Sequence, residues 1–113
     1  MIRLIVRHLT GGRATEVDVV PMGAHQELIL GRALSAAVRF DPRQDPAVGR
    51  YHARITPAGG SPDLLIDDLR SRNGTWLNGV RVSGPTLLHS GDTIRLGATG
   101  PEFELSIDVS DSG

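Results

Sequence analysis

The sequence predicts an all-β domain of the sandwich class, and three observations support this. Apolar and β-branched residues recur in short runs, each ended by Gly, Pro, Asp or Asn. No window of about 11 to 18 residues carries the apolar stripe of a helix. At 113 residues the chain has room for one domain, which is long enough to bury roughly two-thirds of the surface that its unfolded form exposes.

Eleven runs are predicted to be strands, and several of them alternate between two faces. In the first run, Leu4, Val6 and His8 fall on one face of the strand. The predicted strands, in chain order, are Ile2–Leu9, Thr15–Val20, Glu27–Leu30, Ala37–Phe40, His52–Thr56, Leu64–Asp67, Thr75–Leu77, Val80–Val82, Thr86–His89, Asp92–Leu96 and Phe103–Val109.

The segments between these runs are turn clusters of Gly, Pro, Ser and Thr, and no shift in composition marks a second domain. Within them, Arg32–Val38 is the best candidate for a single helical turn. We therefore expect one β-sandwich domain over residues 1–109. The polar residues 110–113 are expected to be a frayed tail, or the start of a linker in a larger multidomain protein.

Composition excludes several classes of protein. The chain has no cysteine, which rules out disulfides and thiolate zinc sites and fits a reducing cytoplasm. Its net charge of −1 lacks the basic footprint of a nucleic-acid binder. No apolar run approaches the ~18 residues of a membrane span. The sequence therefore predicts a cytoplasmic protein with no nucleic-acid partner and no membrane insertion.

All twelve cationic residues are arginine. Two explanations stay open. A GC-rich genome favours arginine codons, whereas a binding site for phosphate or carboxylate uses the planar fork of the guanidinium group. Only the position of each arginine within a motif separates these explanations.

Three short segments stand at the ends of predicted strands. They are Leu30-Gly31-Arg32, Val48-Gly49-Arg50-Tyr51-His52, and a stretch from Ser71 to Gly79 that contains two Asn-Gly dipeptides. Asn-Gly is the strongest short-range signal for a tight hairpin turn, because both residues tolerate positive φ angles. Loops at one end of a β-sandwich cluster in space, so we expect these segments to form one site.

The order and spacing of these segments, with Ser90–Gly97 after them, resemble the forkhead-associated (FHA) domain. The resemblance runs from about Glu27 to Leu105 and rests on Gly-Arg, Arg-x-His, Asp-Leu-x-Ser-x-Asn-Gly-Thr-x-x-Asn-Gly and Ser-Gly-Asp-Thr. It implies an eleven-stranded antiparallel or mixed β-sandwich of the SMAD/FHA type. It also implies that loops at one end bind phosphothreonine in a partner protein, such as a substrate of a Ser/Thr kinase.

The resemblance assigns roles to residues of this chain. It implies that Arg32 holds the phosphate, that Arg50 adds a contact, and that Ser71 and Arg72 approach the phosphate and the threonine methyl group. Asn73 would bond the peptide backbone beside the phosphothreonine. The resemblance further implies that four residues stabilise the loops without touching the ligand: Gly31, His52, Gly74 and Asn78.

The chemistry of these residues supports binding of a phosphate. A phosphate monoester carries nearly two negative charges and three strong acceptor oxygens, which suit arginine forks and backbone amides. The amide side chain of Asn73 both donates and accepts hydrogen bonds, as recognition of a peptide backbone requires.

Gly49 departs from the family pattern. Where members of the family usually have a serine before Arg-x-His, this chain has a glycine, so one hydroxyl donor to the phosphate is missing. A hydrogen bond to a charged group contributes about 1.5 to 3 kcal/mol. The Gly49 amide or Arg72 are the candidates to compensate for this loss. Gly49 therefore keeps a second hypothesis open, a phosphate-independent interaction or oligomerisation domain on the same scaffold.

Enzymatic and metal-binding functions find little support. His52 has no identifiable nucleophile beside it in the motif, so a structural role is favoured over catalysis. The spacing of Asp67, Asp68 and Asp92 matches no calcium loop, and the remaining histidines lack metal-ligand spacing. We therefore expect a non-enzymatic binding module with neither metal nor cofactor.

Overall fold

A computed structural model describes residues 2–22, 27–58 and 63–109, and within these ranges it contains eleven strands and no helix. The strands are β1 (Ile2–His8), β2 (Val17–Pro21), β3 (Leu28–Gly31), β4 (Val38–Arg39), β5 (Ala53–Pro57), β6 (Leu64–Asp68), β7 (Thr75–Leu77), β8 (Val80–Arg81), β9 (Thr86–Leu88), β10 (Asp92–Leu96) and β11 (Glu102–Val109). Every predicted strand is present, with ends that differ by at most two residues. The predicted tail, 110–113, lies outside the described residues.

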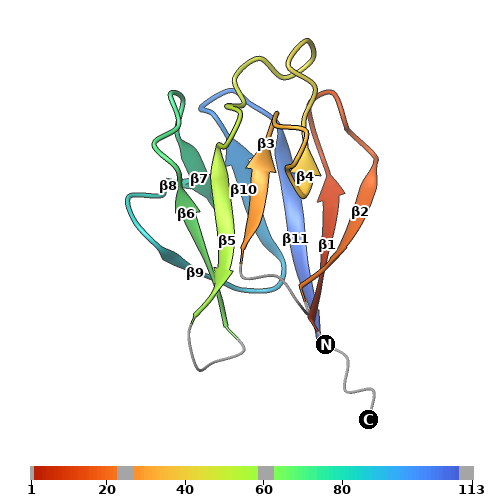
Figure 1. Cartoon of the computed structure of the whole chain (residues 1–113), viewed down its shortest axis with the longest axis vertical. Helices are drawn as coiled ribbons and strands as arrows, with labels where there is room; N and C mark the ends of the chain where they lie inside the picture. Colours follow the sequence, from red (N-terminus) through yellow and green to blue (C-terminus); the bar gives the residue numbers. More distant parts are fainter. Residues whose placement is uncertain (1, 23–26, 59–62, 110–113) are drawn as a thin grey trace.

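The strands form two sheets that face each other, which confirms the mixed β-sandwich (Figure 1). One sheet has six strands in the order β2-β1-β11-β10-β7-β8, and the other has five in the order β4-β3-β5-β6-β9. The ladders between described strands are antiparallel except that between β3 and β4, which is parallel. Among the described residues, no helix has the length and apolar character needed to cross a membrane.

The core lies between the sheets and follows from the alternation along each strand. On β1, Leu4, Val6 and His8 are each 1% exposed, as their shared face predicts. His8 packs against the rings of Phe40 and Phe103, and its Nε2 lies 3.0 Å from the Asp18 carboxylate. The largest apolar core side chains that are almost fully buried are Phe40, Phe103, Leu4, Leu30, Ile55, Leu64, Ile66, Ile94, Leu96 and Leu105.

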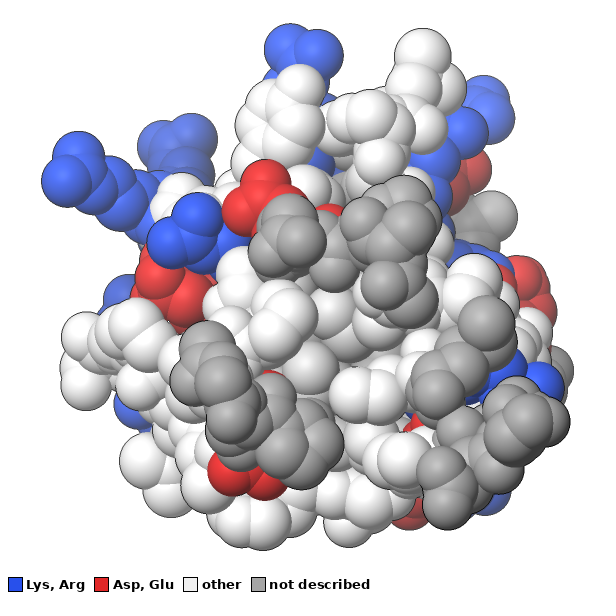
Figure 2. Space-filling model, turned by 60° about the horizontal axis from the view of Figure 1, so that its bottom comes forward, with Lys and Arg blue, Asp and Glu red and all other residues white. Residues whose placement is uncertain are grey.

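Loops from both sheets gather at one end of the sandwich, the upper end in Figure 1. They are the connections β1–β2, β3–β4, β4–β5, β6–β7 and β10–β11. We call this end the loop end. Figure 2 turns the opposite end toward the viewer, and most of the described atoms seen there belong to residues that are neither acidic nor basic.

Two local predictions differ from the structure. Only Asn78-Gly79 is a hairpin turn: both residues have positive φ, and they join the paired strands β7 and β8. In Asn73-Gly74 only the glycine has positive φ, because β6 and β7 belong to different sheets and the segment is a crossing loop. The proposed helical turn within 32–38 is a simple turn with one bond, from the Ala36 amide to the Ala33 carbonyl (3.0 Å).

Candidate functional site

Gly31 ends β3 where the chain makes its closest approach to the β4–β5 loop. A Cβ atom added to Gly31 would lie 2.2 Å from the carbonyl oxygen of Arg50 and 2.8 Å from that of Gly49. The two segments are also joined by backbone hydrogen bonds, from the Arg32 amide to Gly49 (2.9 Å) and from the Ala33 amide to Arg50 (3.1 Å). A glycine is therefore needed here so that Arg32 can sit directly beside this loop.

Arg32 is half-buried and held in place by one edge of its guanidinium group. Its Nε donates to the carbonyl oxygen of Val48 at 2.7 Å. Within the described part of the chain, its two terminal nitrogens have no hydrogen-bond or ion-pair partner. The side chain is thus oriented by the protein while its outer fork stays available to an anion.

His52 joins the β4–β5 loop to the β6–β7 loop from a fully buried position, with 0% exposure. Its Nδ1 accepts a hydrogen bond from the Gly49 amide (3.0 Å), and its Nε2 donates to the carbonyl oxygen of Gly74 (2.7 Å). These contacts require the neutral ring with its proton on Nε2. Burial lowers the pKa of His52 below its ordinary value, outweighing the Gly74 carbonyl and the Asp68 carboxylate, which raise it.

Asp68, the last residue of β6, holds the β6–β7 loop in place through hydrogen bonds. Its carboxylate accepts hydrogen bonds from the Ser71 amide (3.0 Å), the Ser71 hydroxyl (2.5 Å) and the Thr75 hydroxyl (2.7 Å). Burial alone would raise the pKa of Asp68, but these three bonds and the nearby His52 lower it overall, so the carboxylate is ionised. The Ser71 hydroxyl also accepts from the Gly74 amide (2.9 Å). Ser71 is therefore engaged in holding its own loop, and its contact with a ligand stays a prediction.

Asn73, in the β6–β7 loop, connects this loop to the β4–β5 loop. Its Nδ2 donates to the carbonyl oxygen of Ala47 at 2.9 Å, while its side chain remains exposed. The next residue, Gly74, accepts from the Gly97 amide (2.8 Å) as well as from His52. The β10–β11 loop is thereby fixed to the same junction, and Asn73 keeps a free side-chain oxygen among the described contacts.

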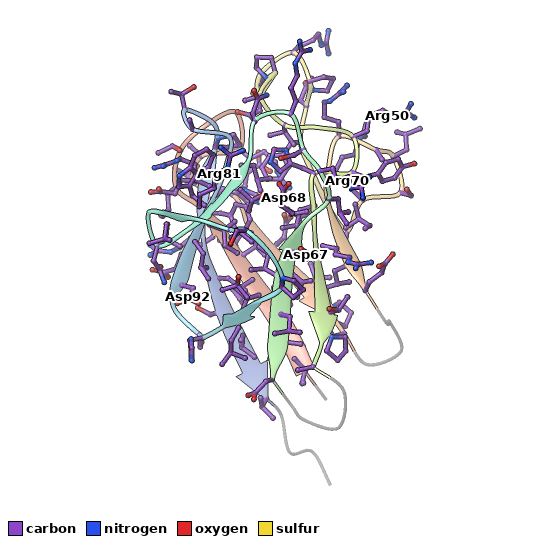
Figure 3. The ribbon with its side chains drawn as sticks, turned by 90° about the vertical axis from the view of Figure 1, so that its left-hand side faces the viewer. Arg50, Asp67, Asp68, Arg70, Arg81 and Asp92 are labelled. Carbon is purple, nitrogen blue, oxygen red and sulfur yellow. The ribbon has the colours of Figure 1, made fainter. Side chains whose placement is uncertain are left out.

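Three further arginines are exposed at the loop end: Arg50, Arg70 and Arg72. None of their side chains has a hydrogen-bond or ion-pair partner among the residues that the structure describes. Figure 3 shows Arg50 and Arg70 on the same side of the loop end. The sequence reasoning included Arg50 and Arg72 but missed Arg70, which occupies a variable position of the motif and has a positive φ of 55°.

Asn78 lies away from this cluster. Its Nδ2 donates to the Asp92 carboxylate (3.0 Å) and its Oδ1 accepts from the Thr93 amide (2.9 Å), so it fixes the β7–β8 hairpin to β10. Asp92 lies well below Arg50 and Arg70 in Figure 3. Asn78 therefore braces the sheet rather than the loop end. Gly31, His52 and Gly74 are the predicted structural residues that the fold brings to the loops.

The loop end carries more exposed cationic than anionic side chains, which suits an anionic ligand. It offers guanidinium groups, whereas the nearby Asp68 is occupied by hydroxyl and amide donors. Over the described residues, no group of three or more His, Cys, Asp or Glu side chains is arranged to hold a metal ion. The predicted site residues Arg32, Gly49, Arg50, Arg72 and Asn73 all lie on the loops that meet here.

Comparison with known proteins gives this fold a family. The model of the FHA domain matches residues 28–97, more than half of the chain. The chain is 34% identical over 62 residues to the FHA domain-containing protein PS1 of Arabidopsis thaliana, covering 53% of this chain and 4% of that protein. It is 46% identical over 48 residues to the ABC transporter ATP-binding/permease protein Rv1747 of Mycobacterium tuberculosis, covering 42% of this chain and 5% of that protein.

These two curated relatives are therefore far longer than the part that this chain matches. A solved structure from a structural and functional analysis of phosphothreonine-dependent FHA domain interactions matches along nearly its full length. Its TM-score is 0.73 and its identity 28%, with 96% of this chain and 99% of that one covered. The match of the family model, over β3 to β10, includes the segments that carry Arg32, His52 and Asn73. The chain belongs to the FHA domain family.

Proposed function

We propose that this domain binds phosphothreonine peptides through its loop end and so mediates phosphorylation-dependent contact between proteins. The main support is a set of arginine side chains that have no partner within the described chain and lie on loops held in place by hydrogen bonds. The outer fork of Arg32 and the side chains of Arg50 and Arg72 have no partner among the described residues. A phosphate with nearly two negative charges is a suitable ligand for them.

Two further facts support the proposal. The chain belongs to the FHA family, and a relative in that family, 28% identical, is described by its phosphothreonine-dependent interactions. The arginines lie on loops whose backbone is held by His52, Asp68 and Asn73, so the loops themselves need little ordering when a ligand binds. The finer parts of the proposal, a Ser/Thr kinase substrate as the partner, a cytoplasmic location and a non-enzymatic role, rest on the family and on the sequence.

Substitution of Arg32 tests the assigned site. Arg32→Ala should weaken binding of a phosphothreonine peptide by about tenfold or more, because a charge-assisted contact contributes about 1.5 to 3 kcal/mol. Fluorescence anisotropy with a labelled peptide from an oriented phosphothreonine library measures the affinity. Arg3→Ala is the matched control, since Arg3 pairs with Asp108 on the outer face of the six-stranded sheet. Unchanged affinity in Arg32→Ala, with the fold intact, would show that the phosphate binds elsewhere.

Gly49 favours a second candidate function, a phosphate-independent interaction or oligomerisation domain. The residue has no hydroxyl group, and its amide already donates to His52 (3.0 Å), so it offers the phosphate no free donor in this conformation. Pulldown with phosphorylated and unphosphorylated forms of one partner separates the two functions. Equal recovery of both forms favours the second function, whereas selective recovery of the phosphorylated form favours the first.

A further inference from the structure

Arg70 stands beside the proposed phosphate site because the pairing of β5 and β6 continues beyond both strands. Ala53 lies opposite Asp68 in the ladder, and the Leu69 amide then donates to the carbonyl oxygen of His52 at 3.0 Å. Arg70 follows Leu69 directly, and Figure 3 shows it on the same side of the loop end as Arg50. Arg70 has a φ of 55°, a conformation that is uncommon for an arginine and that sets the direction of its side chain.

The carboxylates closest to Arg70 in the sequence are engaged elsewhere. Asp67 lies 3.6 Å from the guanidinium group of Arg54, and Asp68 accepts bonds from Ser71 and Thr75. No carboxylate of the described chain forms an ion pair with Arg70.

Two of the three arginines that line the neighbouring groove, Arg13 and Arg43, do have carboxylate partners. This hollow, of about 800 Å³, lies between the β1–β2 loop and residues 37–44. Arg13 there contacts Asp18 (2.7 Å) and Glu16 (3.0 Å), and Arg43 lies 3.7 Å from Asp41.

Arg39 also lines this groove and has no ion pair among the described residues; its Nε donates to the backbone oxygen of Arg32 at 3.5 Å. Arg81 likewise has no carboxylate partner in the described chain and lies over the Trp76 ring. Within the described ranges, the loop-end arginines without a carboxylate partner are thus Arg32, Arg50, Arg70 and Arg72, with Arg39 next to Arg32.

The arginines of the loop end together carry more charge than one phosphothreonine can neutralise. A phosphate monoester carries a charge of about −1.5 to −2 at pH 7, whereas Arg32, Arg50, Arg70 and Arg72 supply four guanidinium groups, with Asp68 as the ionised carboxylate of the same loop. On the basis of the proposed function, we propose that the ligand carries a second acidic group beside the phosphothreonine, and that Arg70 binds it. This group is either a carboxylate side chain or a second phosphate.

A thermodynamic cycle between protein and peptide tests this inference. All peptides contain one phosphothreonine in an otherwise uncharged sequence. In each peptide of the series, one residue before or after the phosphothreonine is replaced by glutamate or by phosphoserine, and this residue differs from peptide to peptide. Each is measured by anisotropy with the unaltered domain, with Arg70→Gln, and with Arg70→Asn, since asparagine adopts positive φ more readily than glutamine. Arg3→Gln removes the same charge far from the loops, and Arg32→Ala reports on the phosphate site.

At one position the added acidic group should strengthen binding by about two- to fivefold, and both Arg70 variants should lose this gain while Arg3→Gln retains it. A gain with both glutamate and phosphoserine identifies a carboxylate as sufficient, and a gain with phosphoserine alone identifies a second phosphate. Absence of any gain that depends on Arg70, with Arg32→Ala still weakening binding of the phosphothreonine peptide, overturns the inference and leaves the proposed function standing. Failure of every phosphopeptide to bind overturns both.

Discussion

At the scale of single residues, His52 determines the geometry of the loop end. Each ring nitrogen has a fixed role, since Nδ1 accepts from the Gly49 amide and Nε2 donates to the Gly74 carbonyl. Protonation would place an N–H group on Nδ1 against the N–H group of Gly49, so the folded state favours the neutral ring. This explains why a histidine, which offers one donor and one acceptor on a rigid ring, occupies this position.

The stability of the domain should therefore depend on His52 as the pH falls. The pKa of His52 is lowered in the folded state, so below its ordinary value of 6.5 the unfolded chain takes up a proton that the folded chain refuses. The stability contributed by His52 is thus fully present above about pH 6.5 and declines below it. Denaturant unfolding should show that the gap in unfolding free energy between the unaltered domain and His52→Gln narrows from pH 7.5 to pH 5.5.

Histidine side-chain NMR gives an independent measurement of the same feature. The ring should carry its proton on Nε2 at neutral pH and resist protonation at pH 6. The interpretation would be contradicted if the difference in unfolding free energy between the unaltered domain and His52→Gln widened at acidic pH. A His52 ring that is already charged at pH 6.5 would contradict it as well.

Gly49 provides a second test at the residue scale. A Cβ atom added to it would lie 3.7 Å from the His52 Nδ1 atom, which is ordinary van der Waals contact, so a serine fits without displacing the loop. If the phosphate binds beside Arg32, Gly49→Ser should tighten phosphopeptide binding by about tenfold or more, because a hydroxyl donor to a charged group is restored. Isothermal titration calorimetry measures this change. Affinity that stays the same would show that other groups already satisfy the phosphate.

At the scale of elements, the contact between the end of β3 and the β4–β5 loop positions Arg32. Gly31→Ala should destabilise the domain by about 1–3 kcal/mol, since the new methyl group meets backbone atoms that no change of rotamer can move aside. Thermal unfolding provides the measurement. Gly84→Ala is the matched control, because a Cβ atom there meets nothing within 4 Å, and it should be neutral or slightly stabilising. Similar losses in both variants would contradict the role assigned to Gly31.

The elements themselves were largely predictable from the sequence. Short apolar runs bounded by turn residues identify all eleven strands, because every strand except the exposed β8 places a side chain in or against the core between the sheets. The least accurate boundary is the start of β2, predicted at Thr15 but observed at Val17. β4, predicted over Ala37–Phe40, is limited to Val38 and Arg39. The two Asn-Gly dipeptides give the same local turn signal, but only the second joins paired strands, since the pairing of flanking strands is decided by the whole sheet.

At the scale of the whole molecule, the topology brings together segments that are far apart in the sequence. β3, β5 and β6 are neighbours in one sheet, and β7 and β10 are neighbours in the other, so their loops meet at one end. The sequence identified these segments by their motifs. The hydrogen bonds that occupy the Ser71 hydroxyl and the Gly49 amide, and the lack of a carboxylate partner for Arg70, follow from distances that only the folded chain defines.

The first and last strands also close the domain. β1 and β11 pair along their full lengths, with Ile2 opposite Val109. We propose that residues 1–109 are the unit that folds and binds.

The most direct test of the central claim compares three forms of one peptide, carrying phosphothreonine, phosphoserine or unmodified threonine at the same position. Isothermal titration calorimetry with the domain should show binding of the phosphothreonine form, binding of the phosphoserine form that is several-fold weaker because the methyl contact is lost, and no measurable binding of the unmodified form. Equal affinity for the phosphothreonine and unmodified forms would contradict the claim that the loop end is a phosphothreonine site.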